Sequence, residues 1–309
     1  MFRSLLVPLD GSKLAEVALP PARALAEATG ARITLVHIVE RDPPQEIHGE
    51  RHLTDASEAE RYLQEVRRQY FGESATPEIH VHASATADVA RGLVAYSQEL
   101  APDLIIMCTH GRGGVRGALF GSKAQQVVGQ GAIPVLLVPP AVEGKEPPSF
   151  TLRRILIPLD GSAAHEKALP AALELAQAFN AQILLLLVVP TLTTLPAEAS
   201  GTGILLPGAM SAVLDLAYEG GANYLRRQVD RIRAGGIACE AEVVRGDPVA
   251  TIVEFSEKLN ADLVVLSTHG KAGMDAFWAR SVAPMVAGRL RRPMLLWPVR
   301  EDQESGPGG

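Results

Sequence analysis

The sequence predicts an α/β protein that consists of two tandem, doubly wound parallel sheets of five strands each. The chain repeats itself, because RSLLVPLDGS from Arg3 returns as RRILIPLDGS from Arg153, at an offset of 150 residues. DLIIMCTHGRGG from Asp103 returns as DLVVLSTHGKAG from Asp262. Within each copy, apolar runs of strand length alternate with helical patterns, which is typical of βαβ units. Right-handed crossovers then fold each copy into one sheet.

The two copies define the expected domains. We expect the first domain over residues 1–140 and the second over residues 151–300, with residues 301–309 as a disordered tail. The Pro-rich segment PPAVEGKEPPSF, from Pro139, is expected to be the linker. The later motif recurs at an offset of 159, so the second copy carries nine extra residues. We expect this insertion as a loop in TLTTLPAEASGTGILLPGAMS, from Thr191, which lacks a clear period.

Five strands are expected in the first copy, namely LLVPL, ITLVHIV, EIHVHA, DLIIMC and IPVLLV. Their nearly continuous apolar character is expected for parallel strands that helices cover on both faces. The helices between them are expected at Glu16–Ala28, Asp55–Tyr70, Asp88–Leu100 and Ser122–Gln130. The sequence does not determine the strand order of this Rossmann-like sheet. If the order is 3-2-1-4-5, the ligand crevice lies between strands 1 and 4, where PLDGS and THGRGG emerge.

The composition excludes several classes of protein. Lys and Arg number 29 against 35 Asp and Glu, a net charge of −6, so nucleic acid is not an expected partner. Two cysteines, Cys108 and Cys239, are too few for a disulfide framework and fit a reducing compartment. The N-terminus lacks an apolar run of signal-peptide length, and the longest run, Ile183–Val189, is far shorter than the roughly 20 residues of a membrane helix. We therefore expect a cytoplasmic protein that has no membrane partner.

A glycine-rich loop follows strand 4 of the first copy. CTHGRGGVRGALFGSK, from Cys108, runs through several glycines to Gly121 and Ser122, where the next helix is expected to begin. Glycines let backbone N–H groups turn toward one point, and a helix start adds unpaired donors and a positive dipole end. Ser122 is expected as the N-cap, and Lys123 adds a positive charge. The pattern favours phosphate binding; the alternative is a purely connective loop, since G-x-x-x-x-G-K-[ST] is absent.

These motifs together resemble the universal stress protein family. The resemblance rests on THG-x9-GS from Thr109, on PLDGS and on ITLVHIVE, and it covers residues 2–299 as a tandem of two family domains. In nucleotide-binding members the motif is G-x2-G-x9-G-[ST], and here Cys108 stands in place of the first glycine. The resemblance implies that ATP, with or without Mg²⁺, is the ligand. Backbone N–H groups that would hold its phosphates belong to Gly111, Gly121, Ser122, Lys123 and Ala124.

The same resemblance implies roles outside this loop. Asp10, at the end of strand 1, would face the ribose or a metal ion on the phosphates, and the backbone of Ile38 would contact adenine. The alternative for Asp10 and for Asp160 is a turn-forming aspartate that hydrogen-bonds its own backbone. The resemblance also implies that the two domains pair through their last strands, IPVLLVPP and RPMLLWPV, and so form an internal pseudo-dimer.

The second copy departs further from the nucleotide motif. Ser267 replaces the first glycine, and Arg280 replaces the glycine before Ser281. The Arg280 side chain either fills the phosphate space or pairs with a phosphate. The first copy is therefore expected to be the main nucleotide site. The cofactor-binding positions expected in the second copy are Asp160, Val188, Gly270 and Ser281.

Other polar residues are assigned structural roles. Asp88 and Asp247 precede helical patterns and are expected to be N-caps. His110 and His269 precede the loop glycines, but no partner at a diagnostic spacing supports a general base. The cluster HGERH, from His48, is expected to lie in a solvated loop. We therefore expect neither a metal site nor a catalytic residue.

Three functions follow from these patterns. The leading hypothesis is an ATP-binding regulatory protein of the stress response, in which the ligand alters a surface that an unidentified protein partner contacts. The second is a slow ATP hydrolase or phosphotransferase, for which only His110 or Asp10 is available. The third is a nucleotide-free interaction scaffold. A non-enzymatic binder is preferred, and a homodimer of the tandem unit is a further expectation.

Overall fold

The computed structural model describes residues 2–39, 46–47, 50–51, 53–72, 76–83, 88–109, 121–140, 150–195, 206–269 and 282–299. The chain divides into two compact units. Unit 1 comprises Met1–Thr151 and Thr268–Gly309, and unit 2 comprises Leu152–Ser267. Unit 1 therefore contains the first repeat together with the last part of the second. The predicted domain boundaries concern the repeats and stay a prediction, as does the tail at 301–309, which lies outside the described residues.

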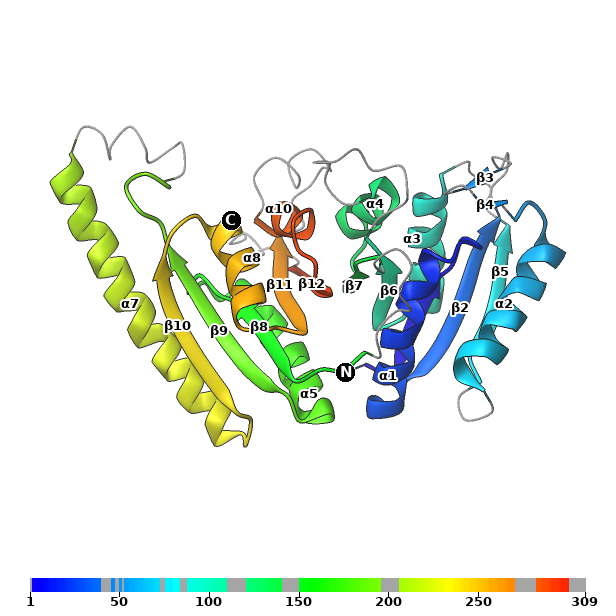
Figure 1. The fold of residues 1–309 in the computed structure, drawn as a ribbon, viewed down its shortest axis with the longest axis horizontal. Coiled ribbons are helices and arrows are strands. Elements are labelled where there is room, and N and C mark those ends of the chain that lie inside the picture. The colour runs from blue at the N-terminus through cyan, green and yellow to red at the C-terminus, as the bar shows by residue number, and fades with distance from the viewer. Residues whose placement is uncertain are drawn as a thin grey trace, which may run out of the picture. The chain divides into compact units, whose positions relative to one another are not determined.

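The sheet of unit 1 has the strand order β5-β2-β1-β6-β7 within the first repeat, and all of its neighbouring strands are parallel. This is the order 3-2-1-4-5 on which the expected ligand crevice depends (Figure 1). A short antiparallel pair, β3 (Glu46–Ile47) and β4 (Glu50–Arg51), lies outside it. The strands of the first repeat are β1 (Ser4–Pro8), β2 (Arg32–Val39), β5 (Glu78–Ala83), β6 (Leu104–Cys108) and β7 (Val135–Val138).

The last strand of the second repeat completes the sheet of unit 1. β12 (Met294–Val299) pairs antiparallel with β7, with Met294 opposite Leu137 and Leu296 opposite Val135. Each of these four side chains is buried. The expected pairing through the last strands is thereby confirmed.

Helices cover both faces of this sheet, as the apolar strands predict. α1 packs against α2, and α3 packs against α4. The helix expected at Glu16–Ala28 is divided in two, because Pro20 and Pro21 have no N–H groups to donate to the carbonyl groups one turn earlier. The helices of unit 1 are the 3-10 helix η1 (Ala15–Ala18), α1 (Leu19–Thr29), α2 (Ala56–Phe71), α3 (Val89–Leu100), α4 (Ser122–Gln130) and α10 (Val282–Ala287).

Unit 2 repeats the same topology. Its parallel strands follow the order β10-β9-β8-β11, which corresponds to β5-β2-β1-β6 of unit 1. Its strands are β8 (Arg154–Pro158), β9 (Gln182–Val189), β10 (Cys239–Arg245) and β11 (Leu263–His269). Its helices are the 3-10 helix η2 (His165–Ala168), α5 (Leu169–Phe179), α7 (Pro207–Ala234) and α8 (Pro248–Lys258).

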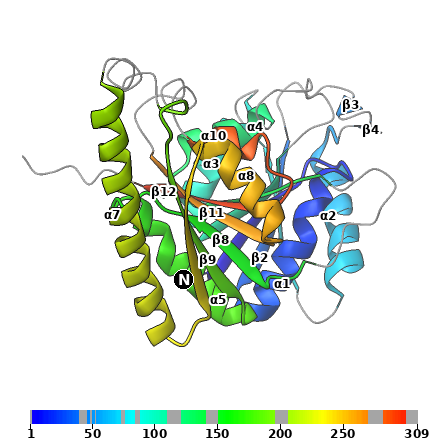
Figure 2. The ribbon, with the colours of Figure 1, turned by 60° about the vertical axis from the view of Figure 1, so that its left-hand side comes forward.

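The predicted loop from Thr191 to Ser211 is wrong at its end, because α7 begins at Pro207 and includes PGAMS. Proline is favoured in the first turn of a helix, where its missing N–H has no helical acceptor. α7 is 28 residues long, whereas its counterpart α2 has 16. It runs along β10 (Figure 2). Part of the insertion therefore lengthens a helix.

One aspartate in each repeat ties the first strand to the fourth at their amino ends. Asp103 Oδ2 accepts hydrogen bonds from the backbone N–H groups of Arg3 and Ser4, at 2.7 and 3.0 Å. In unit 2, Asp262 Oδ2 accepts the corresponding two bonds from Arg153 and Arg154, at 2.8 and 2.9 Å. These carboxylates hold together the two strands whose opposite ends flank the expected crevice.

The predicted N-caps Asp88 and Asp247 are confirmed, whereas the predicted N-cap Ser122 is wrong, because α4 begins at Ser122 and its N-cap is Gly121. Asp88 Oδ1 accepts from the N–H groups of Ala90 and Arg91 at the start of α3. Asp247 Oδ1 accepts from Ala250 N–H at the start of α8. Among the helices of the described ranges, none has both the length and the apolar character that crossing a membrane requires.

We predict that Asp103→Ala lowers the free energy of unfolding by about 1–3 kcal/mol, because it leaves two backbone donors without their acceptor. Urea unfolding followed by circular dichroism measures the change. Glu65→Ala, on the exposed side of α2, is the control and should stay within about 0.5 kcal/mol of the wild type. Equal losses in the two variants would contradict this role of Asp103.

Candidate functional site

The strand order of unit 1 reverses between β1 and β6. β1 has β2 on one side and β6 on the other, with Leu5 opposite Leu104 and Leu6 opposite Ile105. In such sheets the connections that leave these two strands diverge to opposite faces and open a crevice at the carboxyl ends. η1, which follows β1, packs against β6. The predicted crevice position thus agrees with the observed topology.

A tight turn closes the carboxyl end of β1. Asp10 Oδ1 accepts from the backbone N–H of Ser12 at 3.0 Å and from its Oγ at 2.6 Å. Gly11 between them has a φ of 91°, and Ser12 is fully buried. Asp10 therefore forms a turn by accepting from Ser12, which is the alternative role expected from the sequence. The turn also fixes the direction of its carboxylate.

The two ends of the glycine-rich loop lie next to each other. Gly121 N–H donates to the carbonyl of Thr109 at 2.6 Å, which brings the start of α4 to the carboxyl end of β6. The first N–H groups of a helix have no acceptor within the helix, and they lie at the positive end of its dipole. In α4 these groups belong to Ser122, Lys123 and Ala124. The N–H of Gly121, by contrast, is already engaged within the protein.

The other expected site residues are spread over both units. Ile38 is buried in β2, and Val188 is half-buried in β9. Lys123 is exposed at the start of α4, while Ala124 is buried. Asp160 lies two residues after the end of β8 and is exposed. Residues Gly111, Gly270 and Ser281 lie outside the described residues.

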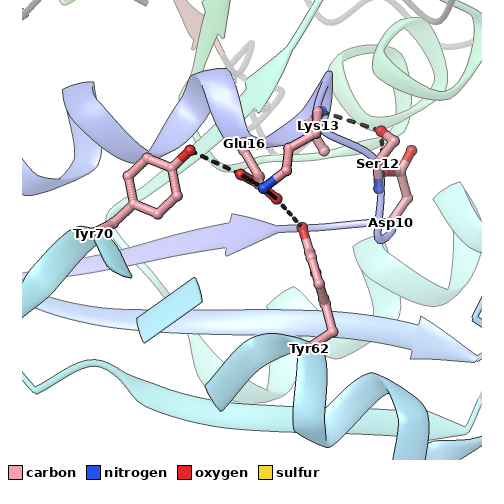
Figure 3. Close-up of polar contacts among 7 residues, drawn as sticks. Asp10, Ser12, Lys13, Glu16, Tyr62 and Tyr70 are labelled. Atoms are coloured by element: carbon pink, nitrogen blue, oxygen red, sulfur yellow. Dashed lines mark hydrogen bonds and ion pairs between the residues drawn. The ribbon is translucent and has the colours of Figure 1, made fainter. Parts of the chain in front are cut away.

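A buried carboxylate that the sequence analysis missed supports the turn after β1 (Figure 3). Glu16, in η1, is only 2% exposed. Its two carboxylate oxygens accept from Lys13 Nζ, each at 2.9 Å, and from the hydroxyl groups of Tyr70 at 2.8 Å and Tyr62 at 3.4 Å. Burial of a charge is costly unless such partners satisfy it. Because both tyrosines lie on α2, Glu16 ties the turn region to the second helix.

These tyrosines are held in the neutral form. Burial is the largest cause that raises the pKa of Tyr62, followed by the negative charge of Glu16. Burial and the hydrogen bond to Glu16 likewise raise the pKa of Tyr70 above its ordinary value of 10.0. Both tyrosine hydroxyl groups therefore keep donating hydrogen bonds to the Glu16 carboxylate well into the alkaline pH range.

Unit 2 builds the same support from other residues. Glu166, at the position equivalent to Glu16, accepts through Oε1 from Tyr224 Oη at 2.8 Å and from Gln228 Nε2 at 3.0 Å. Both donors lie on α7. The offset of 150 residues relates the two glutamates and offered a signal for them. The tyrosines do not follow that offset, so no comparable pattern indicates their role.

The turn after β8 contains a histidine that the sequence analysis also missed. Asp160 Oδ1 accepts from Ser162 N–H at 2.9 Å, as Asp10 does from Ser12, but Asp160 Oδ2 lies 2.7 Å from His165 Nδ1. Ser162 Oγ lies 3.2 Å from the same nitrogen. Burial acts to raise the pKa of Asp160, but hydrogen bonds from His165 and Ser162 outweigh it and hold that pKa well below its ordinary value.

The fold defines a tandem α/β protein in which the strand order of each repeat reverses between its first and fourth strands. The sequence profile described as Universal stress protein family matches residues 1–139 and 151–298. The chain therefore belongs to the universal stress protein family, and it carries two family domains in tandem. The resemblance found in the sequence is thereby confirmed.

Individual relatives support this assignment over both halves. A universal stress protein of Methanocaldococcus jannaschii is 32% identical over 146 residues, which are 47% of this chain and 81% of the relative. One from Mycobacterium tuberculosis is 26% identical over 306 residues, which cover 94% of this chain and 95% of the relative. The crystal structure of a universal stress protein from Archaeoglobus fulgidus has a TM-score of 0.67 at 17% identity and covers 97% of both chains, so it supports the fold.

We predict that Tyr70→Phe lowers stability at neutral pH but makes the alkaline loss of stability shallower. Tyr70 has a raised pKa in the folded protein, so its contribution is fully present below pH 10 and is lost as the pH rises above that value. The difference in unfolding free energy between wild type and variant should therefore narrow above pH 10. Urea unfolding across the alkaline range measures it; a constant difference would refute the linkage.

We predict that Gly11→Ala and Gly161→Ala both lose stability, by about 1 kcal/mol or more, because φ is 91° and 86° at these positions. Gly11→Ala should lose more. A Cβ there lies 2.9 Å from the Leu53 side chain, whereas no atom of the described residues lies within 4 Å of one at Gly161. Thermal unfolding of the two variants measures which of them loses more stability. A larger loss for Gly161→Ala than for Gly11→Ala would contradict the prediction.

Proposed function

We propose that this chain is a nucleotide-binding regulatory protein whose first repeat holds ATP between the Asp10 turn and the start of α4. One observation carries the proposal. The hydrogen bond from Gly121 N–H to the Thr109 carbonyl sets the first turn of α4 at the carboxyl end of β6, and β6 is the neighbour of β1, which the Asp10 turn follows. Helix starts at such switch points are suited to phosphate.

The chemistry of the residues fits a nucleotide. The N–H groups of Ser122, Lys123 and Ala124 are the donors for phosphate oxygens, and the ammonium group of Lys123 supplies a positive charge. The carboxylate of Asp10 accepts from ribose hydroxyls, or contributes one oxygen to a Mg²⁺ ion on the phosphates. The backbone of Ile38 contacts adenine. Gly121 closes the loop rather than donating to phosphate, because its N–H is bonded to Thr109.

The first repeat is the main nucleotide site in this proposal. In the second repeat, Asp160 is engaged by His165 as well as by its own turn, so a ribose hydroxyl has to compete for that carboxylate. The remaining expected positions of that repeat, Val188, Gly270 and Ser281, are secondary candidates.

Regulation follows from linkage between binding and folding. A ligand that binds only the native state stabilises it, by about 2.7 kcal/mol at a concentration 100 times Kd. ATP bound at the carboxyl ends of β1 and β6 would change a surface available to a protein partner or to a second tandem unit. The proposal requires no catalytic residue in the first repeat and describes a cytoplasmic binder.

We predict that Gly121→Trp weakens ATP binding at least about tenfold, because the new side chain occupies the space in front of the α4 donors. The φ of −45° and ψ of 140° at Gly121 are open to any residue, so the variant tests space without backbone strain. Isothermal calorimetry with ATP measures the affinity. Mass spectrometry of denatured purified protein first establishes whether a nucleotide co-purifies.

Gly208→Trp is the matched control. A Cβ at Gly208, in the first turn of α7, meets no atom of the described residues within 4 Å, so this variant should bind ATP like the wild type. Equal affinity of all three proteins would reject the start of α4 as the phosphate site. Absence of ATP binding by the wild type would leave the scaffold hypothesis.

A further inference from the structure

A groove between α7 and β10 is a feature of unit 2 that has no role in the proposed nucleotide site. It has a volume of about 380 Å³ and lies where the helix runs along the outermost strand of that unit (Figures 1 and 2). Ala241 and Val243 form its wall on β10. Its wall on α7 extends from Tyr218 to Arg233, about 22 Å of helix, and β10 is about 20 Å long. The groove therefore has the length of a short extended peptide.

The outer edge of β10 carries backbone groups that face away from the sheet. Among the strands that the structure describes, β10 stands last in its sheet and pairs with β9 alone. The carbonyl of Ala238 accepts from the start of β9, and the N–H of Gly246 donates to its end, so the even-numbered residues bond β9. Backbone groups alternate in direction along a strand, so the N–H and C=O groups of Ala241 and Val243 face outward. These two residues therefore offer both a side-chain wall and a row of backbone donors and acceptors.

Arginine side chains fix α7 to both ends of β10. Arg233 Nε donates to the carbonyl of Cys239 at 2.9 Å, which ties the end of the helix to the start of the strand. Arg245, at the other end of β10, bonds Asp215 at 2.6 Å and lies 5.1 Å from the ring centroid of Tyr218. The groove between these two attachments thus has fixed walls and stays open along its length.

The side chains of the groove determine which kind of strand fits. Leu225 and Val243 line it with apolar surface. Arg226 and Arg233 bring two positive charges to it, and Asp230 brings one negative charge. Alternate side chains of a strand point to the same face. A strand laid along β10 is therefore complementary to the groove when it places a carboxylate and an apolar side chain two positions apart.

The opposite face of β10 argues against a second copy of this chain as the occupant. Glu240 and Glu242 are exposed on that face. Antiparallel pairing of two β10 edges around a two-fold axis would bring four glutamates onto one face of the joined sheet, where like charges repel. A strand with basic side chains on that face would be attracted instead.

We propose that the outer edge of β10 is a docking site for an extended segment of another protein, which adds to β10 as a further strand. On the side of α7, the segment presents a carboxylate to Arg226 and Arg233 and an apolar side chain two positions away. On the other side, it presents basic or neutral side chains to Glu240 and Glu242. The backbone bonds supply affinity, and the two patterns of side chains supply selectivity. The site belongs to unit 2 and does not depend on nucleotide binding by the first repeat.

Fluorescence anisotropy with the full chain and labelled, capped peptides tests the proposal in the absence of nucleotide. The probe TKLTEKT places its leucine and glutamate on one face of a strand and its lysines on the other. TLKTEKT has the same composition but puts the leucine and the glutamate on opposite faces, and TKLTQKT replaces the carboxylate by an amide. TKLTEKT should bind at least about tenfold more tightly than TLKTEKT, and about threefold more tightly than TKLTQKT.

Variants of the chain separate docking at this edge from general attraction between charges. Arg226→Gln should weaken binding of TKLTEKT about threefold and leave binding of TKLTQKT unchanged. Arg227→Gln, exposed on the same helix but outside the groove, is the control. Ala241→Pro removes an outward-facing N–H from an edge strand and should weaken binding about fivefold. Ala222→Trp fills the groove from α7 and repeats the test without a change in β10.

Three outcomes overturn the proposal. The first is that TKLTEKT does not bind saturably, or binds no better than TLKTEKT. The second is unchanged binding in Ala241→Pro and Ala222→Trp, with circular dichroism to establish that both are folded. The third is a wild-type dimer in sedimentation velocity that Ala241→Pro dissociates, because that result assigns the edge to a second copy. Failure of the nucleotide site is measured separately, by calorimetry of Gly121→Trp in unit 1.

Discussion

The buried carboxylate of Glu16 is the constraint on which the placement of α2 against the turn after β1 depends. A buried charge costs several kcal/mol unless donors surround it. Here Lys13 comes from the turn itself, and two tyrosines come from α2, so the turn and the second helix have to meet at one point. In unit 2 the half-buried carboxylate of Glu166 accepts in a similar way from Tyr224 and Gln228. The donor residues differ between the two repeats, whereas both repeats have a glutamate at this position.

Much of this architecture could be predicted from the sequence, because parallel strands read as apolar runs and the repeat sets their number. The helix positions of the first repeat and the N-caps Asp88 and Asp247 were also predictable, since each depends on neighbours in the chain. The strand order could not be predicted, because it depends on packing between distant segments. The position of the crevice was therefore predicted only for an assumed order. The extent of α7 was missed because Gly208 and Pro207 are typical of loops, although proline suits a first helical turn.

The candidate site was predictable to a smaller extent. A glycine-rich loop followed by Gly-Ser indicates a helix start, and the structure describes α4 from Ser122. The hydrogen bond from Gly121 N–H to the Thr109 carbonyl joins residues twelve positions apart, so no local sequence pattern predicts it. His165 was missed because the sequence indicates only a cofactor contact or a backbone turn for Asp160, whereas its contact with His165 depends on the orientation of two side chains. The first repeat, with Ala15 at the same position, gave no hint of a second role.

The antiparallel pairing of β12 with β7 explains why the compact units differ from the repeats. The first repeat ends its own parallel sheet at β7, whose outer edge would otherwise expose unpaired backbone groups. β12 satisfies that edge with buried side chains such as Met294 and Leu296. Removal of the second repeat would therefore take away more than a second copy of the fold, since the sheet of the first repeat would lose the strand that covers its edge. The second repeat thus supplies unit 1 with a strand that the first repeat does not provide, and this pairing accounts for the assignment of Thr268–Gly309 to unit 1.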